Sequence, residues 1–182
     1  MNQAIIYPLA AVLLVSSVFD LRFQKIPNWI TFPAMAAGLA LNGNVSGMDG
    51  LASSAAGILL GTGIFIIPYA MGSMGAGDAK LMGAVGSFLG AWGVLAAALL
   101  TMAVGGVYAI FMMILHRHYG KQILSGLKDS LVSLVLMGRV APSETTGNDI
   151  ANKPRLCYGV AIAGGTFLYM IIESAGYSLL LL

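Results

Sequence analysis

Two aspartates, Asp20 and Asp78, lie within some of the most apolar stretches of this sequence. Each stands at one end of a long hydrophobic run, where an ionised carboxylate costs on the order of 3 kcal/mol unless it meets a partner or water. Two carboxyl groups within hydrogen-bonding reach share one proton, so such a pair can supply a general base and a general acid together. These residue types therefore point to acid–base hydrolysis, provided that the fold brings the two acids together.

Local pairing is the simpler alternative for both acids. Asp20 could form an ion pair with Arg22 or Lys25, and Asp78 could form one with Lys80. Asp78 could also be the N-cap of a helix, a position at which Asp is favoured. On spacing alone, the structural and the catalytic interpretations both stay open.

The glycines that precede Asp78 favour catalysis. The stretch GSMGAGD has Gly72, Gly75 and Gly77 just before the acid, where they remove side-chain bulk and let a second backbone approach Asp78. A protease needs such an approach, because its substrate is held extended beside the catalytic pair.

The composition predicts an integral membrane protein. The 182 residues are 58 % hydrophobic and 9 % charged, which leaves too much apolar surface for a soluble core to enclose. A membrane-spanning helix needs about 20 mostly apolar residues. Six segments are candidates, and they cover residues 3–23, 29–42, 51–70, 78–90, 92–115 and 156–176. We therefore expect an all-α polytopic membrane protein with six transmembrane helices, formed by a single domain over residues 1–182.

The basic residues predict the orientation of these helices. If the helices alternate in direction, all nine Lys and Arg residues fall on one side of the membrane, and they are Arg22, Lys25, Lys80, Arg117, Lys121, Lys128, Arg139, Lys153 and Arg155. The positive-inside rule makes that side cytoplasmic and puts both termini outside. Asp20 and Asp78 then lie at the cytoplasmic ends of the first and fourth helices, at a similar depth.

The long polar connection over residues 116–155 is expected in the cytoplasm. Residues 121–138 have apolar side chains at helical spacing with Lys128 and Asp129 on another face, which predicts a helix lying in the membrane interface. The residues that follow have the Pro, Gly, Ser and Thr content of a loop.

Other binding classes have little support. A net charge of +2 with scattered basic residues is unlike a nucleic-acid-binding surface. His116 and His118 are two residues apart and do not share a helix face, and Cys157 is the single cysteine, so no metal site is predicted. The small-residue spacings at 57–61 and 86–90 suit close helix contacts, within the chain or in a homo-oligomer, and we expect them within the chain.

Two stretches carry a resemblance to a known family. FDLRFQKIPN at 19–28 and GAGDAKLMGAVGSFLG at 75–90 resemble the motifs of the prepilin peptidases, intramembrane aspartic proteases of the GxGD class. The resemblance combines an acid at the end of the first helix, a K-x-P-N turn behind it and G-x-G-D-x-K at the start of the fourth helix. YGVAIAGG at 158–165 also resembles the family's last helix, so that only residues 116–155 lack motif support.

The resemblance implies a function and a set of site residues. The catalytic acids would be Asp20 and Asp78, and the reaction would be hydrolysis of the leader peptide from type IV pilin-like precursors at the cytoplasmic face of the bacterial inner membrane, without a cofactor or metal. The remaining motif residues, near which substrate would approach, are Gly75, Gly77, Lys25, Pro27, Asn28 and Lys80. Of these, Lys80 is expected to reach the membrane surface or a lipid phosphate.

The length of the connection after Asp20 indicates which type of prepilin peptidase the sequence resembles. Only eight residues, Leu21 to Asn28, separate Asp20 from Trp29, which leaves no room for the cysteine-bearing cytoplasmic insertion of the bifunctional members. The sequence therefore resembles the compact, protease-only type associated with Tad/Flp pili. We expect cleavage without N-methylation.

Two functions of other classes compete with a peptidase. A small transporter or proton-relay subunit would also use intramembrane acids, but it needs ionisable groups through the depth of the membrane, whereas Asp20 and Asp78 are expected at one face. A non-catalytic partner in a secretion assembly is the second alternative. A cleavage assay with and without each aspartate discriminates all three.

Overall fold

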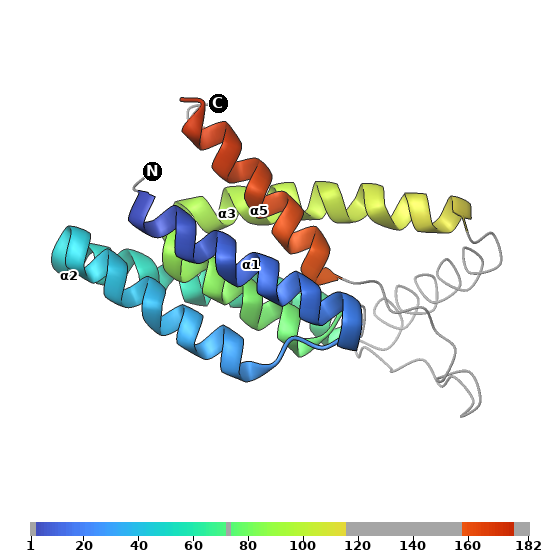
Figure 1. The fold of residues 1–182 in the computed structure, drawn as a ribbon, viewed down its shortest axis with the longest axis horizontal. Helices are drawn as coiled ribbons and strands as arrows, with labels where there is room; N and C mark the ends of the chain where they lie inside the picture. Colours follow the sequence, from blue (N-terminus) through green and yellow to red (C-terminus); the bar gives the residue numbers. More distant parts are fainter. Residues whose placement is uncertain (1–2, 72–73, 116–157, 177–182) are drawn as a thin grey trace, which may run out of the picture.

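The computed structural model describes residues 3–71, 74–115 and 158–176, which form helices joined by short connections. The helices are α1 (Gln3–Phe23), α2 (Asn28–Ala70), α3 (Ala76–Leu115) and α5 (Tyr158–Ser174), shown in Figure 1. Three apolar stretches are long enough to cross a membrane, Gln3–Phe23, Asn28–Ala70 and Ala76–Phe111, and α5 is a shorter apolar helix. The prediction of an all-α membrane protein is thus confirmed.

Helix α2 folds back on itself at a glycine. Gly47 has φ 60° and ψ −136°, a conformation that glycine adopts at little cost and that interrupts the 43-residue helix. On either side of it the chain packs antiparallel, since a Cβ atom on Gly43 would lie 2.9 Å from Leu51 and one on Gly50 would meet the carbonyl oxygen of Asn42. The predicted segments 29–42 and 51–70 are the two arms of this reversal.

Helix α3 is interrupted in the same way at Gly90, with φ 73° and ψ −176°. This backbone region is essentially restricted to glycine. Because the helix is interrupted, the carbonyl oxygens just before Gly90 lack donors from the next helical turn. Side chains of α2 donate to these oxygens instead. The Asn42 amide donates to the carbonyl oxygens of Ser87 (2.9 Å) and Phe88 (3.1 Å), and the Ser54 hydroxyl also donates to that of Ser87 (2.7 Å).

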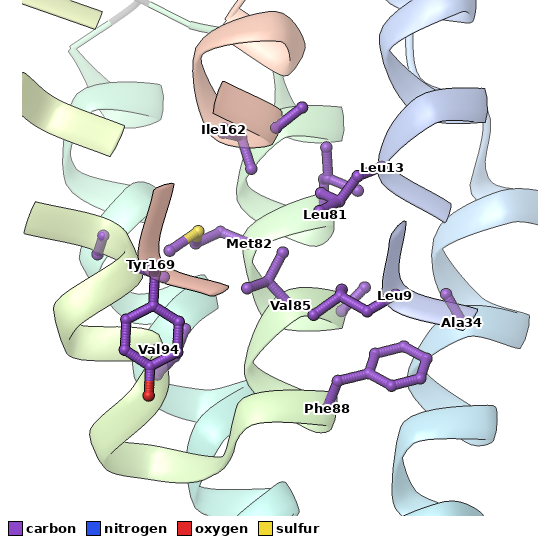
Figure 2. Close-up of a cluster of buried hydrophobic side chains, with 14 of the residues drawn as sticks. Leu9, Leu13, Ala34, Leu81, Met82, Val85, Phe88, Val94, Ile162 and Tyr169 are labelled. Carbon is purple, nitrogen blue, oxygen red and sulfur yellow. The ribbon is translucent and has the colours of Figure 1, made fainter. Parts of the chain in front are cut away.

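The first arm of α3 lies at the centre of the molecule. Residues 81–88 are all buried, because α1, α2, α5 and the second arm of α3 surround them. Figure 2 shows the contacts with side chains from every neighbour, among them Leu9, Leu13, Ala34, Val94, Ile162 and Tyr169. Asp78 lies in the first turn of this arm, so one of the two candidate acids is carried by the most enclosed segment of the described fold.

Glycine contacts bring α2 and α3 together within the chain. A Cβ atom on Gly57 would collide with the backbone of Gly86, and one on Gly61 would lie 2.5 Å from the carbonyl oxygen of Met82. Lipid chains are as apolar as the helices, so close van der Waals packing of this kind holds membrane helices together. The predicted packing of these small-residue spacings within the chain is confirmed.

Several predictions concern residues outside the described ranges. These are the interfacial helix at 121–138, the connection 116–155, the pair His116 and His118, and the first two residues of the predicted segment 156–176. They stay predictions.

Candidate active site

Asp20 is buried in the last turn of α1 and is bound by the start of α5. It belongs to the buried stripe of α1, formed by Ile5, Leu9, Leu13, Ser16 and Asp20, and it is 6 % exposed. Its Oδ2 accepts a 2.8 Å hydrogen bond from the backbone N–H of Gly159, the second residue of α5. The carboxylate therefore faces the partial positive charge of a helix N-terminus.

Gly159 leaves no space on this side of Asp20. A Cβ atom there would lie 2.8 Å from Oδ2, 3.0 Å from Cβ and 3.1 Å from Cγ of Asp20. The absence of a side chain is thus what allows the backbone of α5 to reach the carboxylate. No role was predicted for Gly159, although it lies in the motif-like stretch YGVAIAGG at 158–165.

Asp78 lies in the first turn of α3 and is bound to Gly75. Asp78 Oδ2 accepts a 3.0 Å hydrogen bond from the N–H of Gly75, and the N–H of Asp78 donates to the carbonyl oxygen of Gly75 at 3.1 Å. Gly75 precedes the first helical residue, so it occupies the N-cap position and Asp78 is the third helical residue. The alternative that Asp78 is itself the N-cap is wrong. Its carboxylate instead makes the returning bond of a capping box.

The two acids lie at the same end of the bundle. Asp78 is 7 % exposed, and its carboxyl group lies within electrostatic range of that of Asp20. Each carboxylate accepts a backbone N–H from the start of a different helix, which offsets part of the cost of burying it. Tyr158, the first residue of α5, is half-buried and also lies within electrostatic range of Asp78. The two carboxyl groups are thus near enough to interact electrostatically.

The two motif glycines have different surroundings. A Cβ atom on Gly77 would lie 3.0 to 3.3 Å from atoms of Ile26, so the backbone that approaches Gly77 is the chain's own α1–α2 connection. Gly75 is exposed, and among the described residues a Cβ atom there would meet only Asp78 Oδ2 at 3.4 Å and the N atom of Gly77 at 3.9 Å. The open approach to Asp78 thus lies on the side of Gly75.

Lys80 has a partner other than Asp78. Its Nζ donates a 2.8 Å hydrogen bond to Oδ1 of Asn28, the first residue of α2, and lies 5.4 Å from the centre of the Phe32 ring. Pro27 precedes α2 with φ −74° and ψ 146°, and Lys25 is exposed. The contact between Lys80 and Asn28 was not predicted from the sequence, which favoured the membrane surface for Lys80.

The α1–α2 connection is fixed by an aromatic contact and a tight turn. Phe19 packs edge-on against Trp29 with ring centres 5.5 Å apart. Gln24 has a φ of 51°, which is uncommon for a residue with a side chain, and it ends α1 directly after the turn that carries Asp20. The connection is therefore held close to the end of the bundle that carries both acids.

The described residues contain no group of three or more His, Cys, Asp or Glu side chains that could hold a metal ion. What the arrangement offers chemically is a pair of buried carboxyl groups with a glycine-lined approach. Such a pair can move protons to and from a bound water and a carbonyl oxygen.

Comparisons with known proteins point to one family. Residues 7–110, which contain both acids, match the type IV leader peptidase family. The chain is 32 % identical over 136 residues to the prepilin leader peptidase/N-methyltransferase of Escherichia coli, and the match covers 70 % of this chain and 60 % of that protein. The chain thus spans less than two thirds of the length of this relative. No solved structure matches significantly.

Proposed function

Because the chain belongs to the type IV leader peptidase family, we propose that it is an aspartic endopeptidase that removes the leader peptide from type IV pilin-like precursors. One observation carries the proposal: Asp20 and Asp78, from two separate motifs, are both buried and lie within electrostatic range of each other. Separate local ion pairs would need no such convergence. A proton relay would need ionisable groups along the depth of the membrane.

The proposed reaction uses one ionised and one protonated aspartate. The ionised carboxylate takes a proton from water as the water oxygen bonds to the scissile carbonyl carbon. At the same time, the protonated aspartate gives its proton to the carbonyl oxygen. The C–N bond then breaks as the first acid passes its proton to the leaving amine. The second acid recovers a proton from the new carboxyl group, and the pair returns to its starting state.

Six membrane crossings follow if each reversal of the chain marks a membrane surface. A straight helix of 43 residues would be roughly 65 Å long, about twice the thickness of a bilayer core. The reversals at Gly47 and Gly90 divide α2 and α3 into arms that can each cross once, which supports the six-helix proposal. The start of α1 and the end of α5 lie at the same end of the bundle, away from the acids (Figure 1). With the positive-inside rule, both termini are outside and the site faces the cytoplasm of a bacterial inner membrane.

We further propose the compact, protease-only type that serves Flp/Tad pili. The relative from Escherichia coli is named as an N-methyltransferase as well. In this chain only residues 24–27 connect α1 with α2, and this connection is too short to enclose a methyl donor. The proposed product is therefore a mature precursor with an unmodified N-terminus.

Cleavage of a pilin-like precursor by the purified, reconstituted protein tests the function. We expect Asp20→Asn and Asp78→Asn each to abolish processing, because either change removes half of the proton-sharing pair. Asp49→Asn is the matched control, since Asp49 is exposed and follows the reversal at Gly47, far from the site in sequence. Normal cleavage by either of the first two variants, with wild-type helix content, rules out the aspartic mechanism.

A further inference from the structure

A polar contact joins the two motifs that carry the acids. The ammonium group of Lys80 donates to Oδ1 of Asn28 at 2.8 Å, across 52 positions of sequence. The same ammonium lies 5.4 Å from the centre of the Phe32 ring, within the range of cation–π attraction. Lys80 is half-buried and Asn28 is exposed, so the contact lies at the rim of the site.

This contact closes a short path between the two carboxyl groups. Asn28 begins α2, eight residues after Asp20, and Lys80 follows Asp78 by two residues on α3. Between them, the backbone of Ile26 lies against Gly77, where a Cβ atom would be 3.1 Å from the Ile26 carbonyl oxygen. The α1–α2 connection therefore contacts the start of α3 at two points. Ile26 packs against Gly77, and Asn28 accepts a hydrogen bond from Lys80.

We propose that Lys80 and Asn28 are a positioning pair, which sets the separation of Asp20 and Asp78 by fixing the α1–α2 connection to the first turns of α3. The proposal rests on the function given above and adds a role to two residues outside the acid pair. Neither residue touches the reacting atoms in this role. An exposed contact at the rim of the site contributes little to the free energy of unfolding. Its loss is therefore expected to change the separation of the two acids without unfolding the protein.

Enzyme kinetics distinguish positioning from binding. We expect Asn28→Ala and Lys80→Met each to lower kcat on the order of tenfold, as for loss of a hydrogen bond to a charged group, with KM unchanged. The double variant should be no slower than the slower single variant, because both changes remove one contact. Asn28→Asp and Lys80→Arg keep an acceptor and a donor and should recover most of the kcat. Asn44→Ala and Asp49→Asn, which remove an exposed amide and an exposed charge away from both motifs, are the matched controls.

Other outcomes overturn the proposal. If Lys80→Met is slow while Asn28→Ala is normal, Lys80 acts on substrate or lipid without Asn28. If the variants raise KM and leave kcat unchanged, Lys80 binds precursor and does not position the acids. If their kcat is lowered only in vesicles that contain anionic lipid, Lys80 binds lipid phosphate. Additive losses in the double variant also contradict a shared contact.

A measurement that needs no substrate separates this proposal from the proposed function. In hydrogen exchange on the full chain in detergent, both single variants should speed exchange at residues 24–28 and in the first turn of α3, and the double variant should match them. If the wild-type protein cleaves no precursor, the proposed peptidase function is wrong. The exchange experiment still tests the contact between Lys80 and Asn28 in that case. Unchanged exchange in both variants refutes the positioning pair.

Discussion

Replacing Gly159 with alanine probes the geometry around Asp20 most directly. The added methyl group would lie 2.8 Å from Asp20 Oδ2, whereas ordinary contact begins at 3.4 Å, so the two must separate by about half an ångström. Rotating the carboxylate does not relieve the collision, because Asp20 Cβ would itself lie 3.0 Å from the new methyl group. Either α5 or the end of α1 has to move, and the hydrogen bond from the Gly159 N–H is stretched or lost.

The expected loss is in catalysis. Misplacing a catalytic group by about 1 Å can cost on the order of a hundredfold in rate, so a shift of half that size is expected to lower kcat by roughly tenfold or more. Alanine favours a helix over glycine by about 1 kcal/mol, which offsets part of the packing cost and keeps the protein folded. The time course of cleavage at saturating precursor gives kcat, and thermal unfolding followed by circular dichroism reports the fold.

Gly106→Ala is the matched control for this experiment. Gly106 also lies in a helix, but a Cβ atom there would meet no atom of the described part of the chain within 4 Å. We expect wild-type kcat and equal or slightly higher stability for this variant. A Gly159→Ala protein with wild-type kcat would refute the view that the start of α5 holds Asp20 in place.

Three further predictions address topology, packing and product. Single cysteines at Ser46 and Ser143, in a background without Cys157, should react with impermeant reagent from opposite sides of the membrane, and labelling from the same side contradicts the six-crossing arrangement. Gly57→Leu should lower the thermal stability, because overpacking against the facing backbone of α3 costs about 1–3 kcal/mol. Gly63→Leu should not lower it, because no described residue lies within 4 Å of a Cβ atom there. Equal stability of the two variants argues against close packing at Gly57. Mass spectrometry of precursor incubated with the protein and S-adenosylmethionine should show loss of the leader and no added methyl group, and a methyl gain that depends on the protein would reveal a second activity.

Hydropathy and charge predicted the helices better than their contacts. Long apolar runs give the membrane-spanning stretches, and the glycine spacing at Gly57 and Gly86 correctly predicted a close contact within the chain. The partner of each face could not be predicted, because these helices are apolar on all sides and their periodicity does not reveal which side turns inward. The break at Gly47 lies between two predicted segments and the break at Gly90 lies at the last residue of another, but their backbone angles emerge only from the structure.

The acids of the candidate site could be predicted from the sequence, but the groups that bind and position them could not. Asp20 and Asp78 stand out because a carboxylate in apolar sequence is costly, and that signal is local. The N–H of Gly159 and the partner of Lys80 lie 139 and 52 positions away from the groups they bind. Such contacts depend on how the helices are rotated and how deeply they sit, and neither property is encoded in the spacing of a single motif.

The bond between Gly159 and Asp20 also has a consequence for biogenesis. It joins the first helix of the described chain to the last one, so the carboxylate of α1 is without this donor until α5 has been inserted. Membrane segments emerge from the ribosome in order, and contacts between distant segments form last. A partly inserted chain therefore holds both aspartates but an incomplete acid pair. For the proposed peptidase, we therefore expect activity only after α5 has been inserted.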